Sequence, residues 1–200
     1  MKSVIIIGIV LVGLFIIFQI YTTMSIGKTE TQAYTVIQVE KNYEIRYYSA
    51  ATMAMISSTT KSYRDLGSSG FNKLAKYIFG GNSANKQIAM TSPVHMDIDS
   101  TKSTMAFVLP SIYNESTIPK PNDSSISIIT SEPEYVAAIQ FSGFATNESI
   151  ASHRILLENE LKLKGISYYG NFRCLGYNPP YQLFGRRNEV IVSLNKENFQ

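Results

Sequence analysis

Two neighbouring arginines near the carboxyl end are the side chains best suited to hold an anionic ligand. Arg186 and Arg187 stand in GYNPPYQLFGRRNEV, residues 176–190, and Glu189 follows them. Guanidinium groups bind carboxylates or phosphates through two parallel hydrogen bonds. The structural alternative, which we favour, is an ion pair with Glu189 or another acid at a strand end. Because no second carboxylate lies near Glu189 in sequence, we interpret it as a structural partner and not as a general acid or base.

The other reactive side chains do not form a catalytic pattern. Cys174 is the single cysteine, and with no histidine near it in sequence we expect a buried structural thiol. His95 alternates with Val94 and Met96 and is predicted to face away from their core, and His153 falls on a predicted helix. Neither histidine has a signature spacing for haem attachment. These observations favour a binding protein over an enzyme such as a small hydrolase.

The amino terminus reads as a membrane anchor. Residues 4–18 are all apolar or Gly, and after Gln19 the run continues to give roughly 20 residues, about what a bilayer core needs. The run lacks a small-x-small cleavage site, which favours an uncleaved signal-anchor at residues 1–24 with a linker at 25–34. Lys2 precedes the run, so the positive-inside bias places the rest outside the cytoplasm, in the periplasm if the cell is Gram-negative.

The remaining residues, 35–196, suit one domain with an internal repeat. Two strands, a helix and two strands occur twice in the predicted order. The predicted elements are two strands within 43–56, a helix at 68–79, strands at 86–94 and 104–109, then strands at 126–130 and 135–141, a helix at 147–164, and strands at 168–177 and 188–194. Such a duplicated β-β-α-β-β unit predicts an α+β fold with both helices outside a curved antiparallel sheet or distorted barrel, and a cleft between the halves.

Local patterns support these elements. Phe71, Leu74, Ala75 and Ile78 recur at helical spacing, and Asn147 is the expected N-cap of the second helix. In the last strand Asn188, Val190, Val192 and Leu194 alternate with Arg187, Glu189, Ile191 and Ser193, so the first set should face a core. The net charge of +3 is dispersed without a basic run, which argues against nucleic acid.

Several segments together resemble the SOUL/haem-binding protein family over about residues 34–195. The matching pieces, in order, are YEIRYYSAATMA at 43–54, KYIFGGN at 76–82, KQIAMTSPV at 86–94, FVLP at 107–110, FSGF at 141–144 and GYNPPYQLFGRRNEV at 176–190. The resemblance implies a duplicated α+β distorted barrel similar to gyrase-inhibitor-like domains. It also implies an apolar groove that binds haem or another tetrapyrrole in some members, whereas other members are known more for protein partners.

Carried onto this chain, the resemblance predicts a set of groove residues. They are Phe71, Leu74, Lys76, Tyr77, Ile78 and Met90, with Arg186 and Arg187 as partners of the propionates. Leu74 and Ile78 also lie on the apolar helix stripe, where a core position is the alternative. No residue is singled out as an iron ligand.

One departure from the family pattern bears on the ligand. Gln182 stands where haem-binding members have a basic residue in the segment matched by residues 181–184. Losing one charged contact lowers affinity by about ten- to hundred-fold. Two hypotheses therefore remain: a membrane-tethered tetrapyrrole-binding or buffering module, and a protein-interaction or envelope scaffold domain that has lost haem binding.

Overall fold

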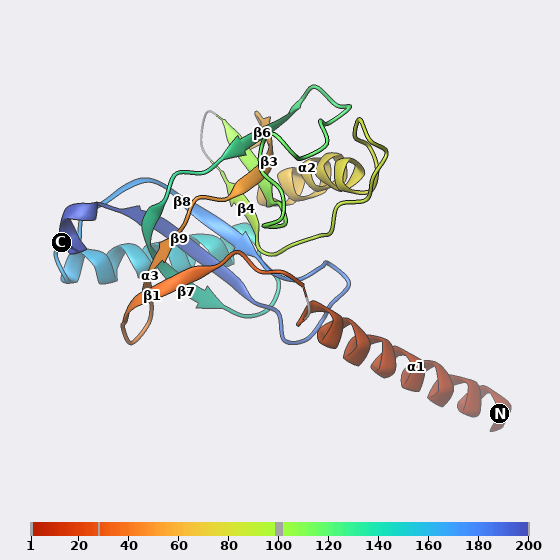
Figure 1. Cartoon of the computed structure of the whole chain (residues 1–200). Coiled ribbons are helices and arrows are strands. Elements are labelled where there is room, and N and C mark those ends of the chain that lie inside the picture. Colours follow the sequence, from red (N-terminus) through yellow and green to blue (C-terminus); the bar gives the residue numbers. More distant parts are fainter. Residues whose placement is uncertain (1, 28, 99–101, 200) are drawn as a thin grey trace.

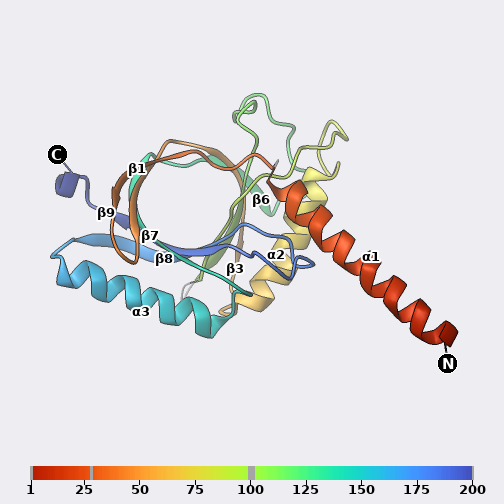
Figure 2. The same ribbon diagram turned by 90° about the horizontal axis from the view of Figure 1, so that it is seen from below.

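Nine strands form one curled antiparallel sheet in the computed structural model, and two helices lie on the outside of the curl (Figures 1 and 2). The structure describes residues 2–27, 29–98 and 102–199; Met1 and Lys28, within the predicted anchor and linker, fall outside these ranges. The elements are α1 (Lys2–Ile26), β1 (Tyr34–Val39), β2 (Glu44–Tyr48), β3 (Thr52–Ser58), α2 (Tyr63–Ile78), β4 (Val94–Asp97), β5 (Ser103–Val108), β6 (Ile126–Thr130), β7 (Glu134–Phe141), α3 (Asn147–Leu163), β8 (Tyr168–Gly176), β9 (Asn188–Leu194) and a final 3-10 helix (Lys196–Phe199).

The strand order confirms the predicted duplication. It runs β1-β2-β7-β9-β8-β4-β5-β3-β6, so that β2, β7, β9 and β8 mirror β6, β3, β5 and β4. The first strand of each half pairs with the second strand of the other half, and β4 and β8 meet at the centre. The pseudo-twofold axis therefore passes between β4 and β8, with α2 and α3 on either side of it.

Three local predictions were wrong. The predicted strand at 86–94 is absent except for Val94, the first residue of β4. The backbone of residues 86–93 bonds elsewhere: Ile88 N donates to Ile78 O, and Ser92 N donates to Glu30 O. The helix α2 begins at Tyr63 and not at Ser68, with Ser62 as its N-cap. The N-cap of α3 is Thr146, whose hydroxyl accepts from Ser149 N in a capping box.

Weak helix formers concealed the start of α2, and packing explains why the helix forms there. The run GSSG at 67–70 has low helix propensity. However, Gly70 faces the sheet so closely that a Cβ there would lie 2.8 Å from Ile56 Cδ1 and 3.2 Å from Met105 Sδ. Glycine thus lets α2 approach β3 and β5, and Leu66 and Leu74 are fully buried beside it.

Each helix covers its own core. The core under α2 includes Leu74, Ile78 and Phe107, and the core under α3 includes Leu157, Val190 and Val192. The predicted core face of β9 is thereby confirmed. Its other face, with Glu189 and Ile191, is also buried, because it lines the concave side of the curled sheet.

The helix α1 projects from the domain and exposes its apolar side chains (Figure 1). Residues 2–24 are long and apolar enough to cross a membrane by length and composition, a test that a signal sequence also passes. The chain that follows is tied to the domain, since Gln32 N donates to Ser92 O and Ser111 N donates to Glu30 Oε1. The added strand β1, which sequence patterns did not reveal, then pairs with β2.

Candidate functional site

A groove runs along α2 at the junction of the two halves. Two neighbouring cavities of about 420 and 430 Å³ make up this groove. Both are lined by Phe71 of α2, Val94 of β4, Gly176 of β8, and Asn178 and Pro180 of the following loop. The groove, called the α2 groove below, therefore lies beside the pseudo-twofold axis, in the region where the sequence predicts a cleft. Its volume falls in the range of small-molecule sites.

The wall that α2 contributes is a stripe next to its core-facing stripe. Arg64, Gly67, Ser68, Phe71 and Asn72 all line the first cavity, at helical spacing i, i+3, i+4, i+7 and i+8. The small residues leave a hollow in the wall, and a Cβ at Gly67 would meet no atom of the described residues within 4 Å. Arg64 is exposed and brings a positive charge to this wall. The sequence prediction missed this stripe because it was based on the apolar residues of the helix, and most of those lie on the neighbouring face, which packs against the core.

The predicted groove residues on and near α2 fall into two groups: some line the groove, and the others do not. Phe71 and Met90 line the groove. Leu74, Tyr77 and Ile78 belong instead to the core under α2, where each is at most 1% exposed, so they present no surface to a ligand. Tyr77 donates its hydroxyl to Pro119 O at 2.9 Å. The side chain of Lys76 is exposed and lines neither cavity.

Arg186 lines the groove, but its guanidinium already has partners. Nη1 donates to Pro179 O and to Gln182 O, both at 2.7 Å, and the group lies over the Phe144 ring at 4.4 Å. Burial lowers the pKa of Arg186. Among the residues that the structure describes, its buried Nε has no hydrogen-bond partner. Arg186 therefore holds the loop after β8 in shape through bonds to its backbone carbonyls.

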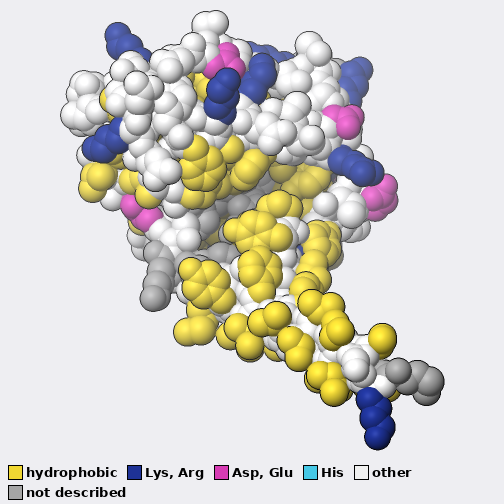
Figure 3. All heavy atoms as spheres, turned by 90° about the vertical axis from the view of Figure 1, so that its right-hand side faces the viewer, with side chains coloured by type: hydrophobic (Ala, Val, Ile, Leu, Met, Phe, Trp, Pro, Cys, Tyr) yellow, Lys and Arg dark blue, Asp and Glu magenta, His cyan; other side chains and the backbone are white. Residues whose placement is uncertain are grey.

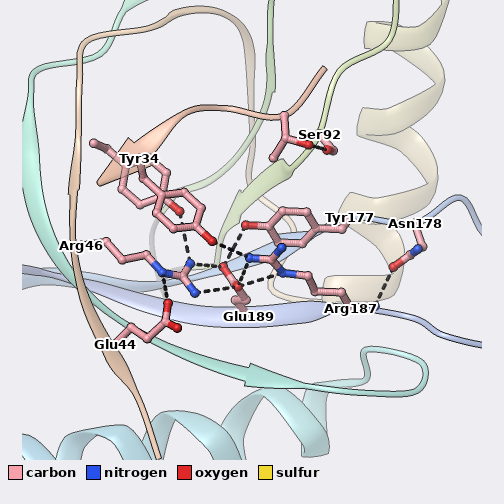
Figure 4. A network of polar contacts seen from close by, with 10 residues as sticks. Tyr34, Glu44, Arg46, Ser92, Tyr177, Asn178, Arg187 and Glu189 are labelled. Atoms are coloured by element: carbon pink, nitrogen blue, oxygen red, sulfur yellow. Dashed lines mark hydrogen bonds and ion pairs between the residues drawn. The ribbon is translucent and has the colours of Figure 1, made fainter. Parts of the chain in front are cut away.

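Arg187 lies on the concave side of the sheet in a network of charges (Figure 4). Its Nη2 is 2.7 Å from Glu189 Oε1, and Arg46 Nη1 is 2.8 Å from Glu189 Oε2. Tyr177 also donates to Glu189 at 2.9 Å. The predicted role of Glu189 as a structural partner is confirmed. Arg187 is thus paired with a carboxylate of the protein, and unlike Arg186 it lines neither cavity of the groove.

Electrostatics explain why this buried glutamate is ionised. Burial opposes ionisation of Glu189, but hydrogen bonds from Arg46 and the charges of Arg46 and Arg187 hold its pKa below the usual value. With Glu44 bonded to Arg46 Nε at 2.7 Å, the network contains two arginines and two glutamates. Its formal charges cancel, which is the condition for burying them.

Gln182 does not face the groove. Its side chain is 1% exposed, accepts from Asn178 Nδ2 at 3.0 Å and donates to Phe184 O at 2.7 Å. These bonds stabilise the loop that forms one wall of the groove. In this structure the side chain at position 182 therefore contributes to the shape of the loop.

Neither histidine nor the cysteine lines the α2 groove. His153 stacks on Phe141 with ring centroids 4.4 Å apart. Burial raises the pKa of Cys174 to about 12, which suits an inert thiol. Within residues 2–27, 29–98 and 102–199, no three or more His, Cys, Asp or Glu side chains are grouped to hold a metal ion.

His95 faces away from Val94 and Met96 as predicted, yet it is buried inside the curl. Its Nε2 lies 2.8 Å from Gln32 Oε1. Burial, with a smaller effect of Arg173, lowers its pKa from 6.5 to about 3. The folded protein therefore keeps His95 neutral at pH values where an unfolded chain would protonate it.

This difference predicts a pH-dependent stability. Because the folded pKa is below the unfolded one, the contribution of His95 is full above pH 6.5 and is lost as the pH falls towards 3. Between pH 7.5 and pH 5 we expect the wild type to lose about 2 kcal/mol more unfolding free energy than His95→Gln. Urea unfolding in detergent micelles, followed by the near-ultraviolet circular dichroism of the tyrosines, measures this. Parallel pH profiles of the two proteins would contradict it.

Comparison with known proteins identifies the family to which this chain is similar. A model of the family described as "SOUL heme-binding protein" matches residues 29–193. The chain is 31% identical over 156 residues to heme-binding protein 1 of Xenopus laevis, an alignment covering 74% of this chain and 81% of that protein. It is 28% identical over 164 residues to heme-binding protein 2 of Mus musculus, covering 78% and 80%.

Among solved structures, the crystal structure of the EcmrR C-terminal domain is similar in fold. Its TM-score is 0.61, and the alignment covers 81% of this chain and 98% of that chain. The sequence identity is 7%, so the likeness concerns the fold alone. The two folds are thus alike although the two sequences are not.

Proposed function

Because this chain belongs to the SOUL heme-binding protein family, we propose that it binds haem or a related tetrapyrrole without catalysing a reaction, while α1 anchors it in a membrane. The observation that carries the proposal is the α2 groove. Its walls combine aromatic, thioether and proline side chains with few charges, as a flat apolar macrocycle requires. When bound, haem would supply an iron porphyrin whose ring absorption, the Soret band, reports binding.

The residues of the groove fit both the apolar ring and the negatively charged propionates of a tetrapyrrole. Phe71 and Pro180 offer flat apolar surface, and the hollow at Gly67 leaves room beside them. Arg64 is exposed at the same wall, so it can pair with a propionate without losing an internal partner. Since neither His95 nor His153 lines the groove, apolar contact and Arg64 carry the proposed binding.

The anchor rests on the length and exposure of α1. Residues 2–24 extend about 35 Å as a helix, enough for a hydrocarbon core of about 30 Å. Lys2 precedes the apolar run, and the positive-inside bias then places the domain on the extracytoplasmic side. The protein would thus present its groove beside the outer surface of a membrane, as a binding or buffering module.

Filling the groove tests the proposed site. We expect Gly67→Leu to weaken haem binding at least tenfold, because the new side chain extends into the hollow next to Phe71. The change should leave the fold intact, since a Cβ there meets no atom within 4 Å and Leu favours a helix more than Gly does. The full chain in lipid nanodiscs is titrated with haem, and the Soret band is recorded.

Ser69→Leu is the matched control, because Ser69 is exposed on α2 and lines neither cavity. Equal haem affinity of the two variants would show that haem binds outside the α2 groove. If the unmodified chain gave no saturable Soret shift at micromolar haem, the haem proposal would fail. The scaffold alternative, in which the domain binds a protein partner, would then replace it.

A further inference from the structure

The loop between β8 and β9 presents an apolar tip next to α1. Residues 177–185, YNPPYQLFG, contain no charged side chain. Within them Tyr181, Leu183 and Phe184 are 57%, 42% and 68% exposed. Hydrophobic side chains cover α1 and continue onto the adjoining part of the domain (Figure 3). Such exposed groups are costly in water and need a partner.

Specific contacts fix this tip against α1. Gln19 Nε2 donates to Tyr181 O at 3.1 Å, and Leu183 N donates to Gln19 Oε1 at 3.0 Å. The Gln19 side chain is buried by this arrangement, which explains a polar residue within the apolar run. The rings of Phe18 and Tyr181 are 6.1 Å apart, and Phe184 shares a small cavity with Phe15 and Ile20.

The position along α1 sets the depth of the tip. If residues 2–24 span the bilayer core, Gln19 lies five residues inside the end of the span, or about 7.5 Å along the axis. Interfacial apolar surfaces insert to about 5–10 Å. The tip bonded to Gln19 would therefore lie within the outer leaflet, with Tyr181 as an aromatic group at the interface.

The α2 groove extends to the contact between the tip and α1. Tyr21 and Thr22 of α1 line one of its cavities together with Phe71, Met90 and Tyr181. One wall of the groove is thus the end of the candidate membrane helix, and another is the loop that carries the apolar tip. A ligand that enters beside Tyr181 passes from apolar lipid to apolar protein.

We propose that the tip at 181–184 inserts into the lipid bilayer beside α1, and that the α2 groove takes its apolar ligand laterally from that leaflet. The inference rests on the proposed membrane anchor. The bilayer is the partner, because the tip is continuous with a helix of membrane-spanning length and is bonded to it below the expected surface.

A single tryptophan tests the insertion, since the chain has none. Phe184→Trp is placed in full-length protein in phosphatidylcholine vesicles, with Tyr169→Trp as control, because Tyr169 is also exposed but lies on β8 seven residues from its groove end. We expect nitroxide groups near the lipid headgroup to quench the tryptophan at 184 and iodide to leave it bright. The control should show the reverse. Iodide quenching at 184 equal to that at 169 would overturn the proposal.

Transfer kinetics test the lateral route separately from haem affinity. Leu183→Asp should slow uptake of haem from preloaded vesicles at least tenfold, because a charge at the tip resists insertion. Its equilibrium affinity in detergent should stay within threefold of wild type, because Leu183 lines neither groove cavity. Unchanged uptake would refute the lateral route. Loss of membrane association after an alkaline wash, or an intact mass below 22.3 kDa, would instead refute the retained anchor.

Discussion

We expect Glu189→Gln to lower the free energy of unfolding by about 3–5 kcal/mol, the cost of breaking a buried ion pair by removing one partner. The substitution keeps the shape of the side chain but leaves Arg46 and Arg187 with Glu44 as their remaining carboxylate. The network then buries a net positive charge. Urea unfolding in detergent micelles, followed by the near-ultraviolet circular dichroism of the tyrosines, measures the loss.

Glu44→Gln is the matched control, because it removes a carboxylate from the same arginine at a position where the side chain is 35% exposed. That change should cost less than about 1 kcal/mol. The difference between wild type and Glu189→Gln should be full above pH 4.5, the usual pKa, and shrink as the pH falls through the lowered folded-state pKa. Equal losses of unfolding free energy in Glu189→Gln and Glu44→Gln would contradict the prediction that burial of the carboxylate determines the cost of removing it.

Leu74→Ala should lower the free energy of unfolding by about 2–5 kcal/mol, because it leaves a cavity in the core under α2. Phe71→Ala, one turn earlier, should in addition weaken haem binding, because Phe71 packs against the same core and also lines both cavities of the groove. The pair separates the core stripe of α2 from its groove stripe. Urea unfolding and Soret titration of both variants provide the two measurements.

Each variant serves as the control for the other. Folded Leu74→Ala, studied well below its unfolding midpoint, should keep haem affinity within about threefold of wild type. If Leu74→Ala lost affinity at unchanged stability, Leu74 would belong to the ligand site and the separation of the two stripes would be wrong.

Patterns with a clear period predicted their elements well. The strands at 126–130 and 188–194 match β6 and β9 residue for residue, and the alternation of β9 correctly named Val190 and Val192 as core. These predictions succeed because alternation or helical spacing sorts side chains by face without reference to the rest of the chain. The repeat, and the family resemblance, follow from the same local patterns.

Predictions that required knowing what lies opposite a residue succeeded less often. Residues 86–94 look like a strand, but only Val94 belongs to one, and the backbone before it bonds to the end of α2 and to Glu30. His95 alternates away from one core and is nevertheless buried, since the curled sheet closes around its other face. The strand β1 has no strong pattern of its own and depends on β2 for its hydrogen bonds.

The sequence by itself determined the family, the duplicated order of elements, the apolar amino-terminal helix and the presence of two adjacent arginines. Only the tertiary structure decided what those arginines do. Arg187 pairs with Glu189 on the concave side of the sheet, whereas Arg186 bonds to loop carbonyls beside the groove. Neighbours in a chain entering a strand point to opposite faces. Which face holds the buried charge network and which the groove depends on Arg46 of β2 and on α2, both more than a hundred residues away in sequence.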